Sequence, residues 1–205
     1  YGRATLSTAS FRGTSPSHTQ VTWNGMKINS PMLGMVDFST IPSYFVDKAD
    51  LYHGPGSVTI SSGGLGGAIA LSSAIPQQDG ISLSFIQGAG SFLTFDEFLH
   101  FTVKKPTWSA STRVYFVSSR NDYKYINYRK KHFFYDDQGN VSGYEYPVER
   151  NKNGSFMDFH VLQDFYLTGR SNGTWNISAW YARTDGGIPL LNEDYKENGG
   201  VAHNQ

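Results

Sequence analysis

Hydrophobic and polar residues alternate with a period of two along most of the second half of the chain. Long alternating segments begin near Ile81, Phe95, Trp108, Met157 and Trp175. This period is typical of a β-strand with one apolar and one polar face, and about ten residues is the length that a tilted strand needs to cross a bilayer. The residues that break the alternation are Glu97 and Gln163 on the apolar faces and Phe98, Leu162 and Trp180 on the polar faces. The pattern predicts five long strands, in either a membrane barrel or a soluble β-sandwich.

The connections between these segments differ in length, and this difference favours the barrel. Residues 104–107 and 171–173 are short turns, whereas residues 121–156 and 186–205 form long polar connections. Outer-membrane barrels alternate short periplasmic turns with long loops outside the cell, and a compact soluble sandwich rarely contains so long a structureless connection. We therefore predict a transmembrane barrel with both long connections outside the cell.

The first third of the chain is built from short apolar segments separated by turns. The strongest turn signal is Asn24-Gly25, which lies between the segments Thr19–Trp23 and Met26–Ile28 and predicts a β-hairpin. A linker rich in proline, glycine and polar residues, 75–80, then separates the short segments from the long alternating ones. We place a domain boundary there, between residues 75 and 76.

Glycines are concentrated in residues 54–67, immediately before the apolar segment Ala68–Leu71. Pro55 lacks the N–H group that a strand ladder needs, and glycine permits backbone angles and close contacts that other residues resist. A phosphate-binding loop is one alternative, but no Gly-Lys-Ser/Thr follows and the third glycine of the dinucleotide spacing is missing. We therefore expect backbone to pack closely against backbone at Gly66 and Gly67.

These turns resemble the motifs of the plug domain of TonB-dependent outer-membrane receptors. The plug motif I-E-V-L-R-G-P-x-S has its counterpart in residues 49–57, and the motif G-G-x-I-N has its counterpart in residues 66–70. Upstream, R-G followed by V-L-I-D-G-V-P-L-N corresponds to residues 12–13 and 21–29. The sequence R-G-T-S-P-S-H at residues 12–18 is most similar to the cobalamin-receptor branch. The sequence departs from the family pattern at three positions. The residues His53, Ser61 and Ala70 stand where the family usually has Arg, Gly and Asn, respectively.

The resemblance implies a mixed α/β plug domain in residues 1–75 and the start of an antiparallel transmembrane β-barrel, about five strands, in residues 76–205. Plugged barrels of this kind have about 22 strands. Five strands cannot close a barrel, and an open sheet would leave unpaired edges in lipid. We therefore expect a fragment of a longer receptor, with the signal peptide, the TonB-contacting segment and most of the barrel outside it.

The resemblance also implies which residues bind ligand and which shape the plug. Residues 14–18 and 30–35 correspond to outward plug loops that touch ligand in the cobalamin branch, and they are rich in small, polar or flexible side chains. The predicted ligand-binding residues are Thr14, Ser15, Ser17, His18, Met32, Leu33 and Met35. The predicted structural residues of the plug motifs are Arg12, Gly13, Gly25, Gly54, Pro55, Ser57, Gly66 and Gly67. The alternative for the two loops is that their side chains only pack against the barrel wall.

The function implied is uptake of a scarce nutrient of the cobalamin, siderophore, haem or glycan class across the outer membrane of a Gram-negative bacterium. The implied partners are TonB, which would deliver the energy that displaces the plug, the nutrient itself and the lipid around the barrel. The alternative is an outer-surface binding or adhesion protein without transport, for which the long aromatic connection would be sufficient.

Composition excludes other classes of function. The 205 residues include 17 basic and 17 acidic ones, so electrostatics gives no support to nucleic-acid binding. Cysteine is absent and the six histidines lack the close spacing of a zinc site, so we expect neither a metal nor a cofactor. Because no nucleophile motif such as G-x-S-x-G is present, we expect no enzyme activity. The basic run at residues 129–132 could hold an anionic ligand or a lipid phosphate, although a solvated loop is the simpler interpretation.

Overall fold

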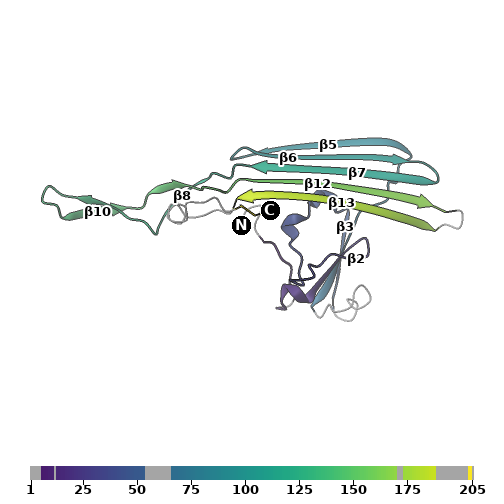
Figure 1. Ribbon diagram of the computed structural model, residues 1–205, viewed down its shortest axis with the longest axis horizontal. Coiled ribbons are helices and arrows are strands. Elements are labelled where there is room, and N and C mark those ends of the chain that lie inside the picture. The colour runs from purple at the N-terminus through teal and green to yellow at the C-terminus, as the bar shows by residue number, and fades with distance from the viewer. Residues whose placement is uncertain (1–5, 12, 54–65, 170–172, 188–202, 205) are drawn as a thin grey trace. The chain divides into compact units, whose positions relative to one another are not determined.

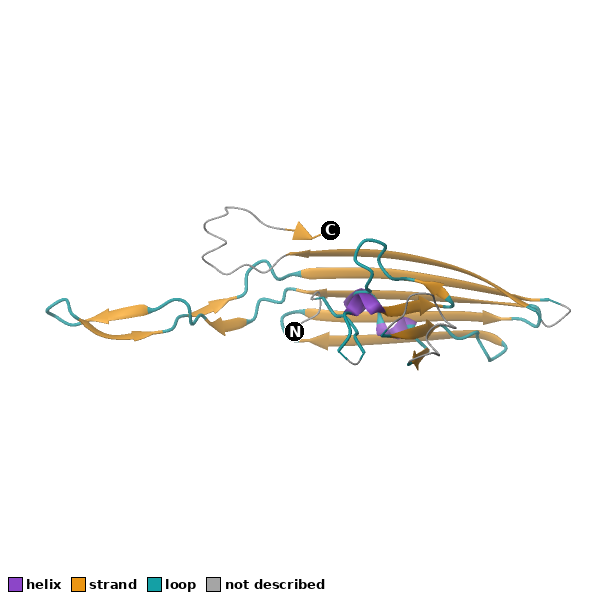
Figure 2. Cartoon of the chain, turned by 90° about the horizontal axis from the view of Figure 1, so that it is seen from below, coloured by secondary structure: helices purple, strands orange, loops and turns teal. Residues whose placement is uncertain are grey.

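A computed structural model describes residues 6–11, 13–53, 66–169, 173–187 and 203–204. These residues form almost entirely strands and turns (Figure 2). The chain divides into two compact units, one of residues 1–86, 98–115 and 159–182 and the other of residues 87–97, 116–158 and 183–205. Because the long strands run through both units, this division does not test the boundary predicted after residue 75, which stays a prediction.

The N-terminal segment, residues 6–74, contains a four-stranded sheet in the order β2-β1-β4-β3. Its strands are β1 (Thr19–Trp23), β2 (Met26–Lys27), β3 (Lys48–Tyr52) and β4 (Gly67–Ser72). The sheet is mixed, because β1 pairs in parallel with β4 whereas the β1–β2 and β3–β4 pairs are antiparallel. The predicted hairpin is confirmed, since Asn24 and Gly25 have φ values of 46° and 85°, as a type I′ turn requires.

Helical structure in the described part of this segment is limited to short 3-10 turns. These turns are η1 (Pro16–His18), η2 (Phe38–Thr40) and η3 (Ser43–Phe45). Ser15 caps η1 and Asp37 caps η2, and each side chain accepts a hydrogen bond from the backbone N–H two residues later. None of the described helices is long and apolar enough to cross a membrane.

The later part of the chain forms a six-stranded sheet in the order β14-β13-β12-β7-β6-β5. Its strands are β5 (Gly80–Gly90), β6 (Thr94–Lys104), β7 (Trp108–Ser119), β12 (Phe156–Thr168), β13 (Thr174–Gly187) and β14 (His203–Asn204). The five long strands correspond to the five alternating segments, and they lie side by side (Figure 1). The turns β5–β6, β6–β7 and β12–β13 are too short for crossover connections, so these neighbours are antiparallel.

In its central strands β7 and β12 this sheet buries the polar face, while the apolar face stays half-buried or exposed. Buried and half-buried residues alternate along β7, and along β12 as far as Tyr166. The buried polar side chains of these two strands include Ser109, Ser111, Arg113, Asp158, His160 and Asp164. The exposed apolar side chains of the flanking strands include Ile81, Leu83 and Phe85 of β5 and Trp175, Ile177 and Tyr181 of β13. A soluble sandwich would bury its apolar face and expose its polar face to water. The observed arrangement therefore favours the transmembrane barrel.

The connection between β7 and β12 was expected to be structureless, and this expectation is wrong. It contains two ribbons, β8 (Lys124–Ile126) paired with β11 (Val148–Arg150) and β9 (His132–Tyr135) paired with β10 (Val141–Glu145) (Figure 1). Aromatic and β-branched residues supply strand propensity on both sides of the turn at residues 136–140. An ion pair of 2.8 Å between Arg150 Nη1 and Asp122 Oδ2 links the two sides of the first ribbon near its base.

Candidate functional site: two loops and a buried junction

The first predicted ligand loop, residues 14–18, is a compact turn held by its own polar groups. The Ser15 and Ser17 hydroxyls lie 3.0 Å apart, and the His18 N–H donates to Ser15 O at 2.9 Å. The Thr14 hydroxyl donates to Phe11 O at 2.7 Å and is therefore already engaged. Ser15 and His18 are exposed, Thr14 and Ser17 are half-buried, and the hydroxyl of Ser17 and the ring of His18 remain within reach of solvent.

The second predicted loop, residues 30–35, is anchored to the sheet by a buried asparagine. The Asn29 amide donates to Thr19 O at 2.9 Å and to Gly34 O at 2.8 Å, and its Oδ1 accepts from Val21 N–H at 2.8 Å. The anchored loop presents two apolar side chains to the outside, since Met32 is 94% exposed and Leu33 63% exposed. Exposed side chains of this size on a fixed loop fit a contact surface better than a packing role.

The structure brings the two loops together, although they are separated in sequence. A β-carbon added at Gly34 would lie 3.3 Å from the Ser17 β-carbon. The first loop also contacts the start of β4, because Gly66 N–H donates to His18 O at 3.1 Å and a β-carbon on Gly66 would collide with Thr14 Oγ1. This geometry agrees with the predicted close packing at Gly66. Arg12, Gly54, Pro55 and Ser57 lie outside the described residues, so their predicted roles stay predictions.

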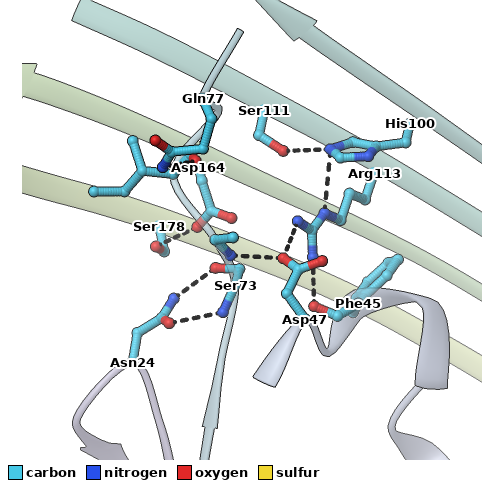
Figure 3. A network of polar contacts seen from close by, with 12 residues as sticks. Asn24, Phe45, Asp47, Ser73, Gln77, His100, Ser111, Arg113, Asp164 and Ser178 are labelled. Carbon is cyan, nitrogen blue, oxygen red and sulfur yellow. Dashed lines mark hydrogen bonds and ion pairs between the residues drawn. The ribbon is translucent and has the colours of Figure 1, made fainter. Parts of the chain in front are cut away.

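Sequence reasoning missed the strongest polar contact between the N-terminal segment and the long strands. Arg113 of β7 is only 1% exposed, and its guanidinium contacts two residues of the N-terminal segment (Figure 3). Nη1 donates to Phe45 O and Nη2 to Asp47 Oδ2, both at 2.5 Å. Nε donates to His100 Nε2 at 3.4 Å, and Ser111 Oγ lies 2.9 Å from the same ring nitrogen. A buried guanidinium is tolerable because it is paired and hydrogen-bonded in this way.

Asp47 also holds the point where the N-terminal segment leaves its last strand. Its Oδ2 accepts a hydrogen bond of 2.6 Å from Ala74 N–H, and the side-chain amide of Asn24 is bonded to both the hydroxyl and the N–H of Ser73. Figure 3 shows these contacts together with the Arg113 cluster. We call the set formed by Asp47, Phe45 O, Arg113 and His100 the buried junction. It joins η3, β3 and the exit from β4 to strands β6 and β7.

Aromatic contacts surround the buried junction and explain the breaks in the alternating pattern. Phe98, on the polar face of β6, stacks on Tyr44 with ring centroids 4.8 Å apart. Trp180, on the polar face of β13, lies 5.1 Å from the ring of Trp23 and 5.8 Å from that of Phe45. Apolar residues therefore occur on the polar face of the sheet where the N-terminal segment packs against it.

The fold and the site define a plugged barrel protein of the outer membrane. Residues 1–68 match the family described as TonB-dependent Receptor Plug Domain. The match identifies this part of the chain as a receptor plug domain, and together with the relatives described below it supports a TonB-dependent receptor of the outer membrane. The predicted family, fold class and location are thereby confirmed, and the N-terminal segment is from here on called the plug.

Two curated relatives belong to the predicted branch. The chain is 34% identical over 68 residues to the vitamin B12 transporter BtuB of Vibrio vulnificus, a match covering 33% of this chain and 11% of that protein. It is 33% identical over 90 residues to the vitamin B12 transporter BtuB of Photobacterium profundum, covering 44% of this chain and 14% of the relative. The matches thus span only a small part of the relatives' length, and both relatives are transporters, not enzymes.

A solved structure shows the same fold. The copper transporter OprC superposes with a TM-score of 0.55 at 16% identity, over 84% of this chain and 25% of that one. At this identity the likeness concerns the fold alone. Among the residues that the structure describes, no group of three His, Cys, Asp or Glu side chains could hold a metal ion.

Proposed function

We propose that this protein takes up a corrinoid of the vitamin B12 type across the outer membrane, by displacement of the plug with energy delivered through TonB. Two observations support a corrinoid: both curated relatives are named as vitamin B12 transporters, and residues 12–18 carry the R-G-T-S-P-S-H sequence of that branch. The siderophore, haem and glycan classes have no comparable support. The alternative of adhesion without transport is not favoured, because the matched proteins are transporters.

The observation that carries the uptake proposal is the covering of the sheet's polar face by the plug. Polar side chains such as Arg113 and His160 are 1% exposed, although they point to the side that would line the lumen of a barrel. A pore filled in this way passes a solute only if the plug moves, and movement of a folded plug against buried contacts needs a supply of energy. TonB is the partner that this family implies for that step.

The ligand site that we propose consists of the two neighbouring plug loops. Ser17 and His18 supply polar groups on the first loop, and Met32 and Leu33 supply exposed apolar surface on the second. A ligand site that combines a few fixed polar groups with apolar contacts suits a large, partly apolar molecule such as a corrinoid. Thr14, Ser15 and Met35 complete the loops, and their contribution to binding is part of the same proposal.

Uptake of radiolabelled cyanocobalamin tests the proposed function. The receptor, expressed from its complete gene in a strain without its own vitamin B12 receptor, should restore uptake when TonB is present and not when it is deleted. A receptor that binds cyanocobalamin at the cell surface but gives no TonB-dependent uptake would refute transport and support the binding alternative.

The proposed site is tested separately by binding to the purified receptor. Replacing Ser17 and His18 together by alanine should weaken cyanocobalamin binding about thirtyfold, because each of the two lost hydrogen bonds to ligand is worth about 1 kcal/mol. Lys27→Gln on the exposed strand β2 is the matched control and should leave binding unchanged. Equal affinities of the folded double variant and the wild type would remove the first loop from the site.

A further inference from the structure

The ribbon formed by β9 and β10 has two faces of different character. Phe133 and Tyr144 lie directly opposite each other, and their rings are in contact with centroids 6.2 Å apart. The chain of rings continues from Tyr144 to Tyr146 at 5.5 Å and from Tyr146 to Tyr128 at 5.1 Å. We call these four residues the aromatic ladder.

The aromatic ladder is open to solvent. Tyr128 is 70% exposed, Tyr144 50% and Phe133 44%. The rings meet edge to face, at interplanar angles between 60° and 77°. Contiguous exposed rings in this arrangement leave ring faces open, to which another ring can bind by stacking or by an edge contact.

Positive charge lies on the ladder and beside it. The Lys131 ammonium stands 4.2 Å from the centroid of the Tyr144 ring, and Arg129 precedes it on the exposed turn into β9. The nearby acids already have partners: Glu149 is paired with Lys130 at 3.6 Å and accepts hydrogen bonds from Asn127 at 3.0 Å and Tyr125 at 3.3 Å, and Asp122 is paired with Arg150.

The opposite face of the same ribbon provides a natural comparison. His132 and Phe134 stack there at 6.4 Å, and Glu145 lies opposite His132 in the strand register. Glu145 is the acidic residue of β9 and β10, so it lies on the face that does not carry the ladder. Phe134 is 47% exposed, which nearly equals the exposure of Phe133 on the ladder.

We propose that the aromatic ladder, with Lys131 and Arg129, binds an anionic group attached to an aromatic ring on the transported ligand. The rings supply stacking and the two cations supply charge complementarity, so the surface selects a ligand that has both features. This inference rests on the proposed uptake function and deepens it. Vitamin B12 contains such a part, because its benzimidazole base is joined to the corrin through a ribose phosphodiester.

Binding of three probes to the purified full-length receptor tests the ladder. Cyanocobalamin has the base and the phosphate, and dicyanocobinamide has the corrin without the base. α-Ribazole 5′-phosphate has the base and a phosphate on the 5′ carbon of its ribose, without the corrin. The wild-type receptor should bind cyanocobalamin at least about tenfold more tightly than dicyanocobinamide, since one charge-assisted contact alone is worth that factor.

Variants on the two faces of the β9–β10 ribbon then show which residues cause this difference in affinity. Lys131→Gln and Phe133→Leu should each lower the affinity for cyanocobalamin and for α-ribazole 5′-phosphate while dicyanocobinamide binds as before. The matched controls, Phe134→Leu on the opposite face and Lys124→Gln on the other ribbon, should change none of the three affinities. Lys131→Gln removes no packed side chain, so it keeps the test valid if Phe133→Leu disturbs the ribbon.

The outcomes distinguish a failure of the ladder proposal from a failure of the corrinoid proposal. If neither corrinoid binds but α-ribazole 5′-phosphate binds in a manner that depends on Lys131, the corrinoid proposal fails and the ladder stands. A cyanocobalamin preference that Lys131→Gln and Phe133→Leu leave unchanged would overturn the ladder proposal, as would a failure of α-ribazole 5′-phosphate to bind the wild type.

Discussion

At the scale of single residues, Gly67 is a position where the backbone has no room for a side chain. It has φ of +154°, and an added β-carbon would lie 2.9 Å from both Tyr52 O and Phe11 Cδ2. Tyr52 O belongs to the neighbouring strand, so the clash cannot be relieved without disturbing the β3–β4 pairing. The glycine pattern of the sequence therefore reports a real packing requirement at this point.

We predict that Gly67→Ala destabilises the plug by about 1–3 kcal/mol, the usual cost of forcing extra volume into a packed site. Gly90→Ala in β5 is the control, because an added β-carbon there would meet only the Thr94 side chain, at ordinary distances of 3.5 Å to Cβ and 3.9 Å to Cγ2. Urea unfolding of the purified receptor, followed by a probe in the plug, measures both variants. Equal stability of the two would contradict close packing at Gly67.

Asp136 controls the turn at the tip of the β9–β10 ribbon. Its Oδ1 accepts hydrogen bonds from Asn140 N–H at 2.8 Å and Gln138 N–H at 3.0 Å. The backbone hydrogen bond from Asn140, followed by the one from Gln138, lowers the pKa of Asp136 below its ordinary value of 3.8. The charged carboxylate therefore stabilises the turn fully above pH 3.8, and this contribution disappears as the pH falls through the lowered pKa.

We predict that amide exchange at Asn140, corrected for its intrinsic rate, is slow at neutral pH and speeds up only below pH 3.8. In Asp136→Asn the acid-dependent step should vanish, because the amide side chain does not titrate. An identical step in the variant would show that another group controls the turn.

At the scale of elements, the buried junction couples β7 to the plug through one ion pair. The Arg113 side chain is 2% exposed and the Asp47 side chain 37% exposed, so the pair lies at the edge of the interface and water screens it in part. Removing the carboxylate would leave a buried guanidinium without its counter-charge, whereas replacing both partners by apolar residues would remove that penalty.

We predict that Asp47→Ala destabilises the plug by about 2–3 kcal/mol, at the low end for buried pairs because Asp47 is partly exposed. Adding Arg113→Met should recover part of this loss, so the double-mutant cycle gives a favourable coupling energy. The control is Lys48→Gln, whose ion pair with Asp50 is exposed to solvent and should affect stability much less than the buried pair. Additive effects of Asp47→Ala and Arg113→Met in urea unfolding would contradict coupling through the junction.

The sequence indicated the elements well and the contacts between them poorly. The period of two located all five long strands because alternation follows directly from strand geometry, and Asn24-Gly25 located the hairpin because its angles need those residues. Arg113 and Asp47 gave no signal, since an arginine on the polar face of a predicted strand is equally compatible with open water. The one available signal for the interface was the set of apolar residues on polar faces, Phe98, Leu162 and Trp180, which occupy the side that faces the plug.

The two loops and the ribbon show the same limit. Resemblance to a family located residues 14–18 and 30–35, and the antiparallel β1–β2 hairpin brings the two loops to the same end of the sheet. The hydrogen bonds of the buried Asn29, which anchor the second loop, are not revealed by local sequence. The ribbon strands were missed because the alternation there is short and the residues on both faces are aromatic. Binding roles for both regions remain proposals until binding is measured.

At the scale of the whole molecule, the decisive feature is which face of the long-strand sheet meets lipid. The apolar face must contact the membrane and the polar face must contact the plug, and the breaks in the pattern must be plug contacts. The membrane-spanning role of the long strands and the covered lumen both follow from this single assignment.

A nitroxide scan along β7 of the receptor in lipid vesicles tests that assignment most directly. Collision with dissolved oxygen, which is concentrated in the bilayer, should be frequent for labels at Ala110, Thr112, Val114 and Phe116. It should be rare for labels at Ser109, Ser111, Tyr115 and Val117, and the two sets should alternate residue by residue. More frequent oxygen collisions in the second set of labels than in the first, or collisions that do not alternate along the strand, would contradict a plugged membrane barrel.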